Sequence, residues 1–424
     1  IWDGLRTQRL DRPYVRKNGK LTAVNWAEAF DTIAEKVNGT VPENIGAIAG
    51  DLSSVEEIYA MRELMAAIGS PNVDCRPENS ALDPTLGRSS YIFNSTIQGI
   101  EDASSILLVG VNPRKEAAVL NSRIRKRWRI GQLPLGLIGE EVDLTYDYRY
   151  LGAGPDTLEE VASAEGPPGD RKMLIVGEGA INRPDGAAVL AAAARMALEN
   201  GLINEEWCGF NILHTAAARV GGLDLGFVPG EGGKATEGML RESEVLFILG
   251  ADELDMTQRT SGFTVYVGSH GDIGAHHADV ILPGAAYTEK SGTWVNTEGR
   301  VQMGMRATFP PGEAREDWAI LRALSESLGH TLPFDSLAQL RKRLYEVHPH
   351  FEMIDTIPEM DPAGDETGAT GIEKLAGRKG GRMTKQPFVS PVDDFYLTNP
   401  IARASAVMAE CSTRAKGEFL EAAE

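Results

Sequence analysis

Cysteine is scarce in this chain of 424 residues. Only Cys75, Cys208 and Cys411 occur, they lie far apart, and no CxxC pair is present. A four-thiolate iron–sulfur or zinc site built from cysteine alone is therefore excluded. An odd and sparse set of thiols also favours a reducing compartment over a framework of disulfide bonds.

Long apolar runs and an excess of positive charge are missing as well. No run approaches the roughly 20 residues needed to cross a bilayer, and no signal peptide is present, so we expect no direct membrane insertion. The formal net charge of −19 makes nucleic acid or an anionic lipid surface a poor partner for the whole molecule. The chain begins at Ile1 and not at Met, so we expect that something preceding it has been removed or left out.

Short apolar runs alternate with helical stretches along most of the chain. In NWAEAFDTIAEKV the apolar residues recur on one helical face, with Asn25 as the expected cap and Asn38-Gly39 as the expected stop. The runs that we expect to be strands are IGAIAG and residues 106–109, 173–176, 245–249, 263–269 and 279–284. Continuous apolar strands that alternate with helices indicate parallel sheets with right-handed crossovers. The sequence therefore predicts an α/β fold with at least two three-layer units.

Changes in composition divide the chain into five expected parts. Residues 155–170 are polar and rich in Gly, Pro and Glu, which places a boundary there. Residues 355–386 are poor in apolar side chains and are expected to lie extended on the surface. The expected parts are an N-terminal arm (1–20), a first α/β unit (21–154), a second α/β unit (155–305), a helical region (306–354) and an extended tail with a terminal helix (355–424).

Two short motifs match part of a ligand site without completing one. GEGAIN, residues 177–182, follows an expected strand, but it lacks the third glycine of a dinucleotide fingerprint and the acidic residue about 20 positions on. HGDIGAHHADVILP carries the adjacent His276 and His277, whose side chains diverge. No carboxylate or thiolate completes a zinc ligand set there at a usual spacing. We interpret both motifs as structural.

A basic segment stands out in this acidic chain. SRIRKRWR, residues 122–129, packs five cations into seven positions, and on a helix Ile124 and Trp128 would turn inward. Nucleic acid could use such a patch, but the overall charge opposes it. We interpret the segment as a docking face for an acidic partner subunit.

Cys75, in NVDCRPENS, is a further candidate. A thiolate beside Arg76 could ligate a soft metal, and the arginine would lower its pKa. A lone cysteine is more often a small buried hydrophobe, and no second ligand lies near it in sequence. No Ser-His-Asp order, paired-carboxylate motif or P-loop is present either. The residues themselves therefore assign no catalytic, cofactor-binding or metal role.

Several long segments resemble one family. ILLVGVNPRKEAAVLNSRIRKRW, VDLTYDYRYLG, HGDIGAHHADVILPGAAYTEKSGTWVNTEGRVQ and FYLTNPIARASAVMAEC are similar to the large peripheral iron–sulfur subunit of respiratory complex I, the NADH:quinone oxidoreductase. The similarity runs from about Trp2 to Cys411, nearly the whole chain. It concerns only the C-terminal part of that subunit, which has the molybdopterin-oxidoreductase fold.

The resemblance implies a supporting role in respiratory electron transfer from NADH to quinone. In that family the [2Fe-2S] and [4Fe-4S] clusters lie in an N-terminal region that has no counterpart here, so no cofactor is expected in this chain. The resemblance implies a redox-inactive scaffold in which residues 287–302 are an inherited core segment. The expected partners are the other hydrophilic-arm subunits of complex I. The expected location is peripheral, on the cytoplasmic side of the bacterial inner membrane or on the matrix side of the mitochondrial one.

The alternative is a catalytic subunit of a molybdopterin-dependent oxidoreductase. In active enzymes a similar GxxNVD segment precedes the metal ligand, which offers Cys75 or Ser80 as the molybdenum ligand in this chain. The histidine that usually neighbours that ligand is missing. A second alternative is a stand-alone nucleotide-binding protein that uses GEGAIN.

Overall fold

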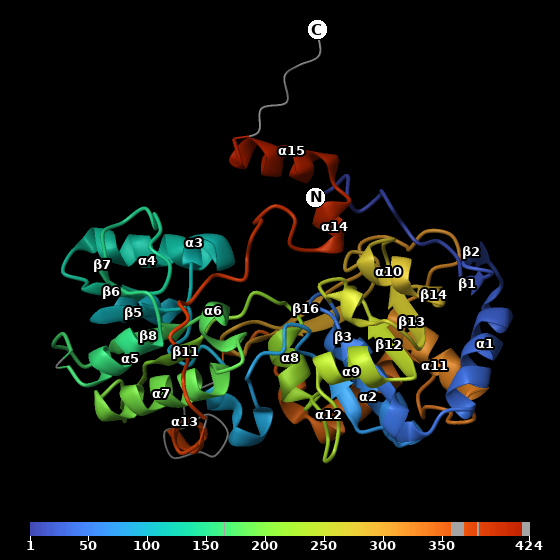
Figure 1. The fold of residues 1–424 in the computed structure, drawn as a ribbon, viewed down its shortest axis with the longest axis horizontal. Helices are drawn as coiled ribbons and strands as arrows, with labels where there is room; N and C mark the ends of the chain where they lie inside the picture. The colour runs from blue at the N-terminus through green and yellow to red at the C-terminus, as the bar shows by residue number, and fades with distance from the viewer. Residues whose placement is uncertain (165, 358–368, 380, 418–424) are drawn as a thin grey trace, which may run out of the picture.

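Two mainly parallel sheets lie side by side in the computed structural model, which describes residues 1–164, 166–357, 369–379 and 381–417 (Figure 1). The larger sheet has seven strands in the order β2-β1-β14-β13-β12-β3-β4, and all of its pairs are parallel except those that β1 makes with β2 and β14. Its strands are β1 (Tyr14–Lys17), β2 (Lys20–Ala23), β3 (Ile45–Ala49), β4 (Asn72–Asp74), β12 (Val245–Leu249), β13 (Phe263–Gly268) and β14 (Val280–Pro283).

The smaller sheet has five parallel strands in the order β11-β8-β5-β6-β7. Its strands are β5 (Ser105–Val109), β6 (Leu135–Ile138), β7 (Arg149–Gly152), β8 (Lys172–Val176) and β11 (Phe210–Ile212). Two antiparallel hairpins complete the described strands, namely β9 (Ile203–Asn204) with β10 (Trp207–Cys208) and β15 (Gly292–Val295) with β16 (Val301–Gly304).

Helices cover both faces of each sheet, which makes two three-layer units (Figure 1). On the five-stranded sheet, α3 and α4 lie on one face and α5 and α7 on the other. No helix in the described part of the chain is long and apolar enough to cross a membrane. The α-helices are α1 (Trp26–Asn38), α2 (Val55–Ile68), α3 (Pro113–Glu116), α4 (Ala118–Ile130), α5 (Pro155–Ala162), α6 (Glu178–Ile181), α7 (Gly186–Glu199), α8 (Arg219–Asp224), α9 (Thr236–Glu242), α10 (Ile273–His277), α11 (Asp317–Ser327), α12 (Leu337–Val347), α13 (Ala369–Ala376), α14 (Pro400–Arg403) and α15 (Ala406–Ala415).

The local chemistry of the sequence explains most of these elements. In α1, the side chain of Asn25 accepts a hydrogen bond from the Glu28 N–H, and the helix ends at Gly39 as expected. Its apolar stripe is buried against the seven-stranded sheet. Every residue of β3 and β12 is buried, because helices cover both faces of the sheet. The predicted α/β class is thus confirmed, and each predicted strand is present within about one residue of its expected bounds.

The boundary expected at residue 155 does not separate the two sheets. Strands β5, β6 and β7 precede it and strands β8 and β11 follow it, yet all five lie in one sheet. The seven-stranded sheet likewise combines strands from residues 14–74 with strands from residues 245–283. Residues 155–162 form α5, which packs on this sheet unit with Leu158 buried, and the pairing of distant strands decides which segments share a core.

The tail departs from the expected extended chain at one place. Residues 369–376 form α13, which buries Ile372 and Leu375 against α7, because these two apolar side chains lie on one face of a short helix. The expectation of extended chain is therefore wrong for these residues, while residues 358–368 lie outside the described part.

Residues 384–399, which we call the strap, then cross from one sheet to the other. Phe388 is buried, and its N–H donates to the Ala153 carbonyl at 2.8 Å. Beyond the strap, the chain terminus packs beside the first residues, since Thr7 donates to the Ala404 carbonyl at 2.5 Å. Residues 384–411 therefore run along the described protein, from Ala153 just beyond β7 to the first residues of the chain. Figure 1 shows α14 and α15 beside the N-terminus, with α15 standing away from both sheets.

Candidate functional site

A cleft of about 640 Å³ lies where the carboxyl ends of strands from both sheets meet. Asp51 follows β3, Glu116 lies beyond β5, Glu178 follows β8, and Asp252 lies beyond β12. The crevice outside the carboxyl ends of parallel strands is where open α/β sheets bind ligands. This cleft is therefore the candidate site, and residues 391–399 of the strap form one of its walls.

Acidic side chains dominate the cleft, and the fold itself holds them. Glu178 accepts hydrogen bonds from the Thr215 N–H at 3.0 Å and from its hydroxyl at 2.7 Å. Glu116 accepts the Asn112 N–H and the Ser390 hydroxyl, both at 2.8 Å. Burial raises the pKa of both glutamates to about 7. These carboxyls hold loops and the strap in place.

The arginines of the cleft are already paired with its own acids. Arg219 is only 2% exposed, and its guanidinium forms a two-pronged ion pair with Glu78 and lies 3.2 Å from Asp51. Arg403 donates to Asp272 at 2.6 Å. Neither cation is free to receive an anionic ligand unless an internal carboxylate gives way.

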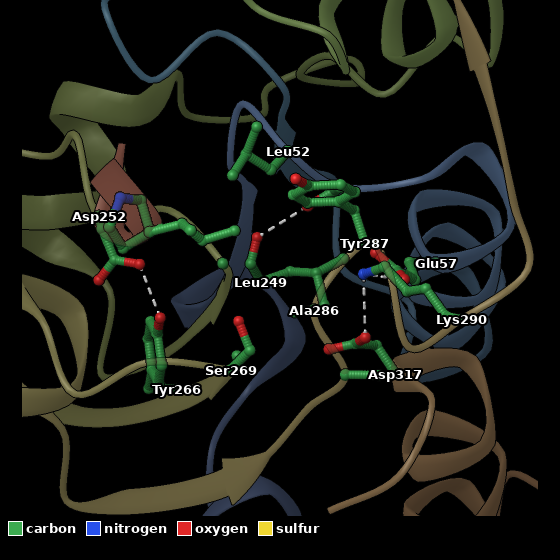
Figure 2. Close-up of a pocket in the computed structure, with 16 residues that line it drawn as sticks. Leu52, Glu57, Leu249, Asp252, Tyr266, Ser269, Ala286, Tyr287, Lys290 and Asp317 are labelled. Atoms are coloured by element: carbon green, nitrogen blue, oxygen red, sulfur yellow. Dashed lines mark hydrogen bonds and ion pairs between the residues drawn. The ribbon is translucent and has the colours of Figure 1, made fainter. Parts of the chain in front are cut away.

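A second, much smaller cavity of about 40 Å³ adjoins the cleft at the edge of the seven-stranded sheet (Figure 2). Its walls include the ion triad of Lys290, Glu57 and Asp317, and Lys290 Nζ lies 3.2 Å from Asp317 Oδ2. On the opposite side, the Tyr266 hydroxyl donates to Asp252 at 2.7 Å. The volume suits one or two water molecules and is far too small for an organic cofactor.

The segment 287–302 enters this region as a hairpin. Strands β15 and β16 pair with each other, and the turn between them uses Asn296 and Gly299, whose φ of +80° is favourable only for glycine. Thr293 is fully buried, and both its N–H and its hydroxyl donate to Glu56 at 2.8 Å. Arg341 also pairs with Glu56. The hairpin is thus anchored as part of the core.

GEGAIN and the histidine pair, the two motifs that matched part of a ligand site, lie in the following surroundings. GEGAIN follows β8 and contains α6, a helix of only four residues. The strap lies so close that a Cβ on Gly179 would sit 2.4 Å from the Val389 carbonyl oxygen. His276 and His277 lie exposed at the end of α10. Among the described residues, no group of three or more His, Cys, Asp or Glu could hold a metal ion.

Comparison with known proteins decides the family. The model for molybdopterin oxidoreductase matches residues 9–327. The chain belongs to this family. A second model, which describes the C-terminal part of one NADH-ubiquinone oxidoreductase subunit, matches residues 366–411.

Curated relatives agree with this assignment. The mitochondrial NADH-ubiquinone oxidoreductase 78 kDa subunit of Candida albicans is 42% identical over 421 residues, which are 96% of this chain and 57% of that protein. The corresponding NADH-quinone oxidoreductase subunit of Rickettsia conorii is 40% identical over 97% of this chain and 59% of its own length. The chain thus spans less than two thirds of these relatives. The resemblance to this complex I subunit is confirmed.

At the level of fold, acetylene hydratase from Pelobacter acetylenicus aligns with a TM-score of 0.57 at 13% identity, covering 92% of this chain and 74% of that one. The formyltransferase/hydrolase complex from Methylorubrum extorquens aligns with a TM-score of 0.53, also at 13% identity. That alignment covers 74% of this chain and 98% of the other. These likenesses confirm the molybdopterin-oxidoreductase fold and carry nothing further.

Membership of the molybdopterin oxidoreductase family implies a molybdenum–pterin cofactor, and the residues of the cleft do not fit it. Cys75 and Ser80, the two ligand candidates, do not line the cleft. Cys75 is 2% exposed and packs against Gly222 of α8, and burial raises the pKa of its thiol to about 12, which disfavours the thiolate that a metal needs. The phosphate-bearing cofactor would also meet buried acids and two arginines that are already paired.

Sequence reasoning missed the residues that define this cleft. It did not predict Arg219, Glu178 or Asp252, although Glu178 and Asp252 lie within three residues of a strand end. The sequence did hold a signal for Glu178 and Asp252. Both are polar residues that come just after a buried strand, in GEGAIN and GADELD, and the carboxyl ends of parallel strands meet at one edge of the sheet. Nothing in the sequence pointed to Arg219, whose partners Asp51 and Glu78 are distant in the chain.

Proposed function

We propose that this chain is the scaffold part of the large peripheral iron–sulfur subunit in the hydrophilic arm of proton-translocating NADH:quinone oxidoreductase. The observation that carries the proposal is identity of 39 to 42% over 96 to 98% of the chain with proteins named as that subunit. In this proposal the chain takes no part in redox chemistry. It holds the cluster-bearing region of the full-length protein and buries surface against neighbouring subunits.

The chemistry of the cleft supports a scaffold. Electron tunnelling between clusters needs fixed separations, so a supporting domain must be rigid. The internal ion pairs of Arg219 and the contacts of the strap join parts of the chain that lie 141 to 274 residues apart. Such contacts fix loops and the strap against the sheets they adjoin.

The remaining parts of the proposal concern the full-length protein. We place its [2Fe-2S] and [4Fe-4S] clusters in the portion outside this chain, because none of the three cysteines of the chain neighbours another. Its partners would be other hydrophilic-arm subunits. Its position would be peripheral, on the cytoplasmic face of a bacterial inner membrane or on the matrix side in mitochondria.

The deciding experiment is elemental analysis of the native, full-length protein purified from membranes through a tag on this chain. We expect several iron atoms per chain, no stoichiometric molybdenum, and co-purification with the other subunits and with NADH:quinone oxidoreductase activity. Molybdenum near one per chain would instead favour a catalytic subunit of a molybdopterin-dependent oxidoreductase. A protein that purifies without iron and without those subunits would refute the proposal.

A further inference from the structure

Helix α4 concentrates positive charge on the surface of a strongly acidic molecule. Five cations fall within its sequence, which has no acidic residue, while the whole chain carries a net charge of −19. The helix covers the outer face of the five-stranded sheet (Figure 1) and buries Leu120 and Ile124 there. Its opposite face is directed away from the described protein.

Only part of this charge is neutralised within the described chain. Glu101 pairs with Arg123 at 2.5 Å and with Lys126 at 2.7 Å. Arg125 instead donates to the Thr145 carbonyl, and Arg129 has no carboxylate partner among the described residues. Both of these arginines are exposed. Two guanidinium groups are therefore available for carboxylates from outside.

Exposed apolar side chains lie among these cations. Val119 is 84% and Ile130 is 74% exposed, and no described segment covers either. Their spacing of eleven residues places them on one face of α4, about 16 Å apart. Lys126 lies between them on that same face. A helix face that serves only to carry charge into solvent gives no reason for two large apolar side chains to be so exposed. A face that docks against another protein does.

A hollow at the end of α4 completes the surface. It measures about 730 Å³ and is lined by Trp128, Arg129, Gly131, Gln132, Leu133 and Pro134. Tryptophan and arginine are enriched in the parts of interfaces that bind most strongly. The Trp128 indole offers an apolar wall, and the Arg129 guanidinium lies beside it. The hollow therefore suits an apolar side chain of a partner whose neighbouring residues carry carboxylates.

We propose that the outer face of α4, from Val119 to Ile130 with the hollow beside Trp128, binds an acidic segment of another subunit through carboxylates and one apolar anchor. The proposal rests on the proposed function, because it takes the partner from the same complex. Charge complementarity selects this occupant. A second copy paired symmetrically through this face would bring its own cations against these, and nucleic acid or an anionic membrane would meet the repulsion of the remaining surface.

The test uses the native complex purified through a tag on this chain. In separate preparations, Val119 and Ile130 are each replaced by benzoylphenylalanine, a photoreactive residue, and the crosslinked peptides are identified by mass spectrometry. We expect a crosslink from both positions to one segment of another subunit with an excess of Asp and Glu. Crosslinks to nucleic acid, to lipid or to a second copy of this chain would overturn the proposal.

A pair of substitutions measures the contribution of this face. The double variant Arg129→Ser with Ile130→Ser removes one cation and one exposed apolar side chain from α4. The matched control is Lys342→Ser with Val347→Ser on α12, which removes the same two kinds of group, Val347 being 60% exposed. We expect the α4 variant to retain the crosslinked subunit roughly tenfold less after a salt wash, and the control to retain it fully.

The outcomes separate this inference from the function on which it rests. If the chain co-purifies with the other subunits but gives no crosslink from either position, the docking face is wrong and the proposed function stands. If it carries no such subunits, both are overturned. Equal thermal midpoints of the isolated variants show that neither substitution unfolds the chain, since exposed substitutions usually shift stability by at most about 0.5 kcal/mol.

Discussion

Lys290 lies with its ammonium group between the carboxyls of Glu57 and Asp317, and the three side chains are 8, 3 and 5% exposed. Two buried carboxylates beside one cation would leave an uncompensated negative charge. Burial, followed by the charge of Asp317, raises the pKa of Glu57 to about 8. Although burial lowers the pKa of Lys290, the two carboxylates outweigh it, so Lys290 keeps its charge. The triad thus retains a proton at neutral pH.

This proton makes stability depend on pH. Because the pKa of Glu57 is raised from 4.5 in the unfolded chain to about 8 in the fold, its contribution is complete below pH 4.5 and is lost as pH rises through about 8. We expect Glu57→Gln, which keeps the shape but cannot ionise, to lose less unfolding free energy than the wild type between about pH 5 and 8. Urea unfolding of both proteins at several pH values measures this difference in unfolding free energy.

The matched control is Glu35→Gln, which removes an exposed carboxyl from α1. This variant is expected to keep the pH slope of the wild type, because the Glu35 side chain is exposed to solvent in the folded chain. If the unfolding free energies of Glu57→Gln and the wild type change with pH in parallel, the retained proton is not on Glu57.

Individual residues were only partly predictable from the sequence. The sequence drew attention to Cys75. The burial of this residue agrees with the interpretation as a small buried hydrophobe and not with the interpretation as a metal ligand. The triad was not foreseen, because Glu57 and Lys290 meet only after α2 and the loop before β15 have packed. A buried charge looks the same in sequence as an exposed one until its partner is known.

Elements whose causes are local were predictable. The cap and apolar stripe of α1, and the continuous apolar runs of β3, β8 and β12, each contain their own signal. Helix α13 was not expected, because its two buried side chains lie in a stretch rich in glycine and charge. Its helical form depends on packing against α7, which is information that the local sequence does not carry.

The strap is an element without regular secondary structure, and Phe388 is its main anchor. The ring is 1% exposed, and the guanidinium of Arg183 lies 5.1 Å from its centre. We expect Phe388→Ala to release residues 384–399 locally and to accelerate proteolytic cleavage there by about tenfold or more, because burial of a phenylalanine contributes about 3–5 kcal/mol. Limited proteolysis with mass spectrometry of the fragments measures it.

Val389→Ala is the matched control, since the neighbouring side chain is 60% exposed. Cleavage of this variant is expected at the wild-type rate. Unchanged cleavage in Phe388→Ala would mean that the hydrogen bonds of the strap, such as that from Ser390 to Glu116, hold it without the ring. A loss of all far-UV circular dichroism would mean that the strap and the sheets unfold together.

At the scale of the whole molecule, the order of the strands in the two sheets could not be predicted from local sequence patterns. Their order follows from pairings such as β3 with β12 and β1 with β14, between segments that no local pattern connects. The expected boundary at residue 155 fell inside one sheet for this reason. The alternation of apolar strands and helices predicted the α/β class, but it could not predict the order of the strands within each sheet.

The net charge of −19 also acts on the whole molecule. Repulsion among exposed acids destabilises the compact state, and salt screens it. We expect the thermal midpoint of the isolated chain to rise by a few degrees when ionic strength increases from about 0.01 to 0.15 M, as the Debye length falls from about 30 to 8 Å. Exposed ion pairs weaken too, but each contributes only about 0–1 kcal/mol. Differential scanning calorimetry measures the midpoint.

Removing surface acids provides the control for this prediction. Glu205→Gln, Glu206→Gln and Glu231→Gln combined remove three exposed carboxyls, and the midpoint of this variant should respond less to salt than that of the wild type. A midpoint that falls with salt would show that attractive ion pairs outweigh the repulsion.

The pairing of β3 with β12 has a consequence for synthesis. Its neighbour β12 begins beside Glu244, which hydrogen-bonds Asn44 across 200 residues of chain. At about 5–20 residues per second, a ribosome needs roughly 10–40 s to produce that interval. During this time a fully apolar strand has emerged without the neighbour that will cover its edge. The nascent chain is therefore a natural client for chaperones that shield exposed strands until translation has passed residue 249.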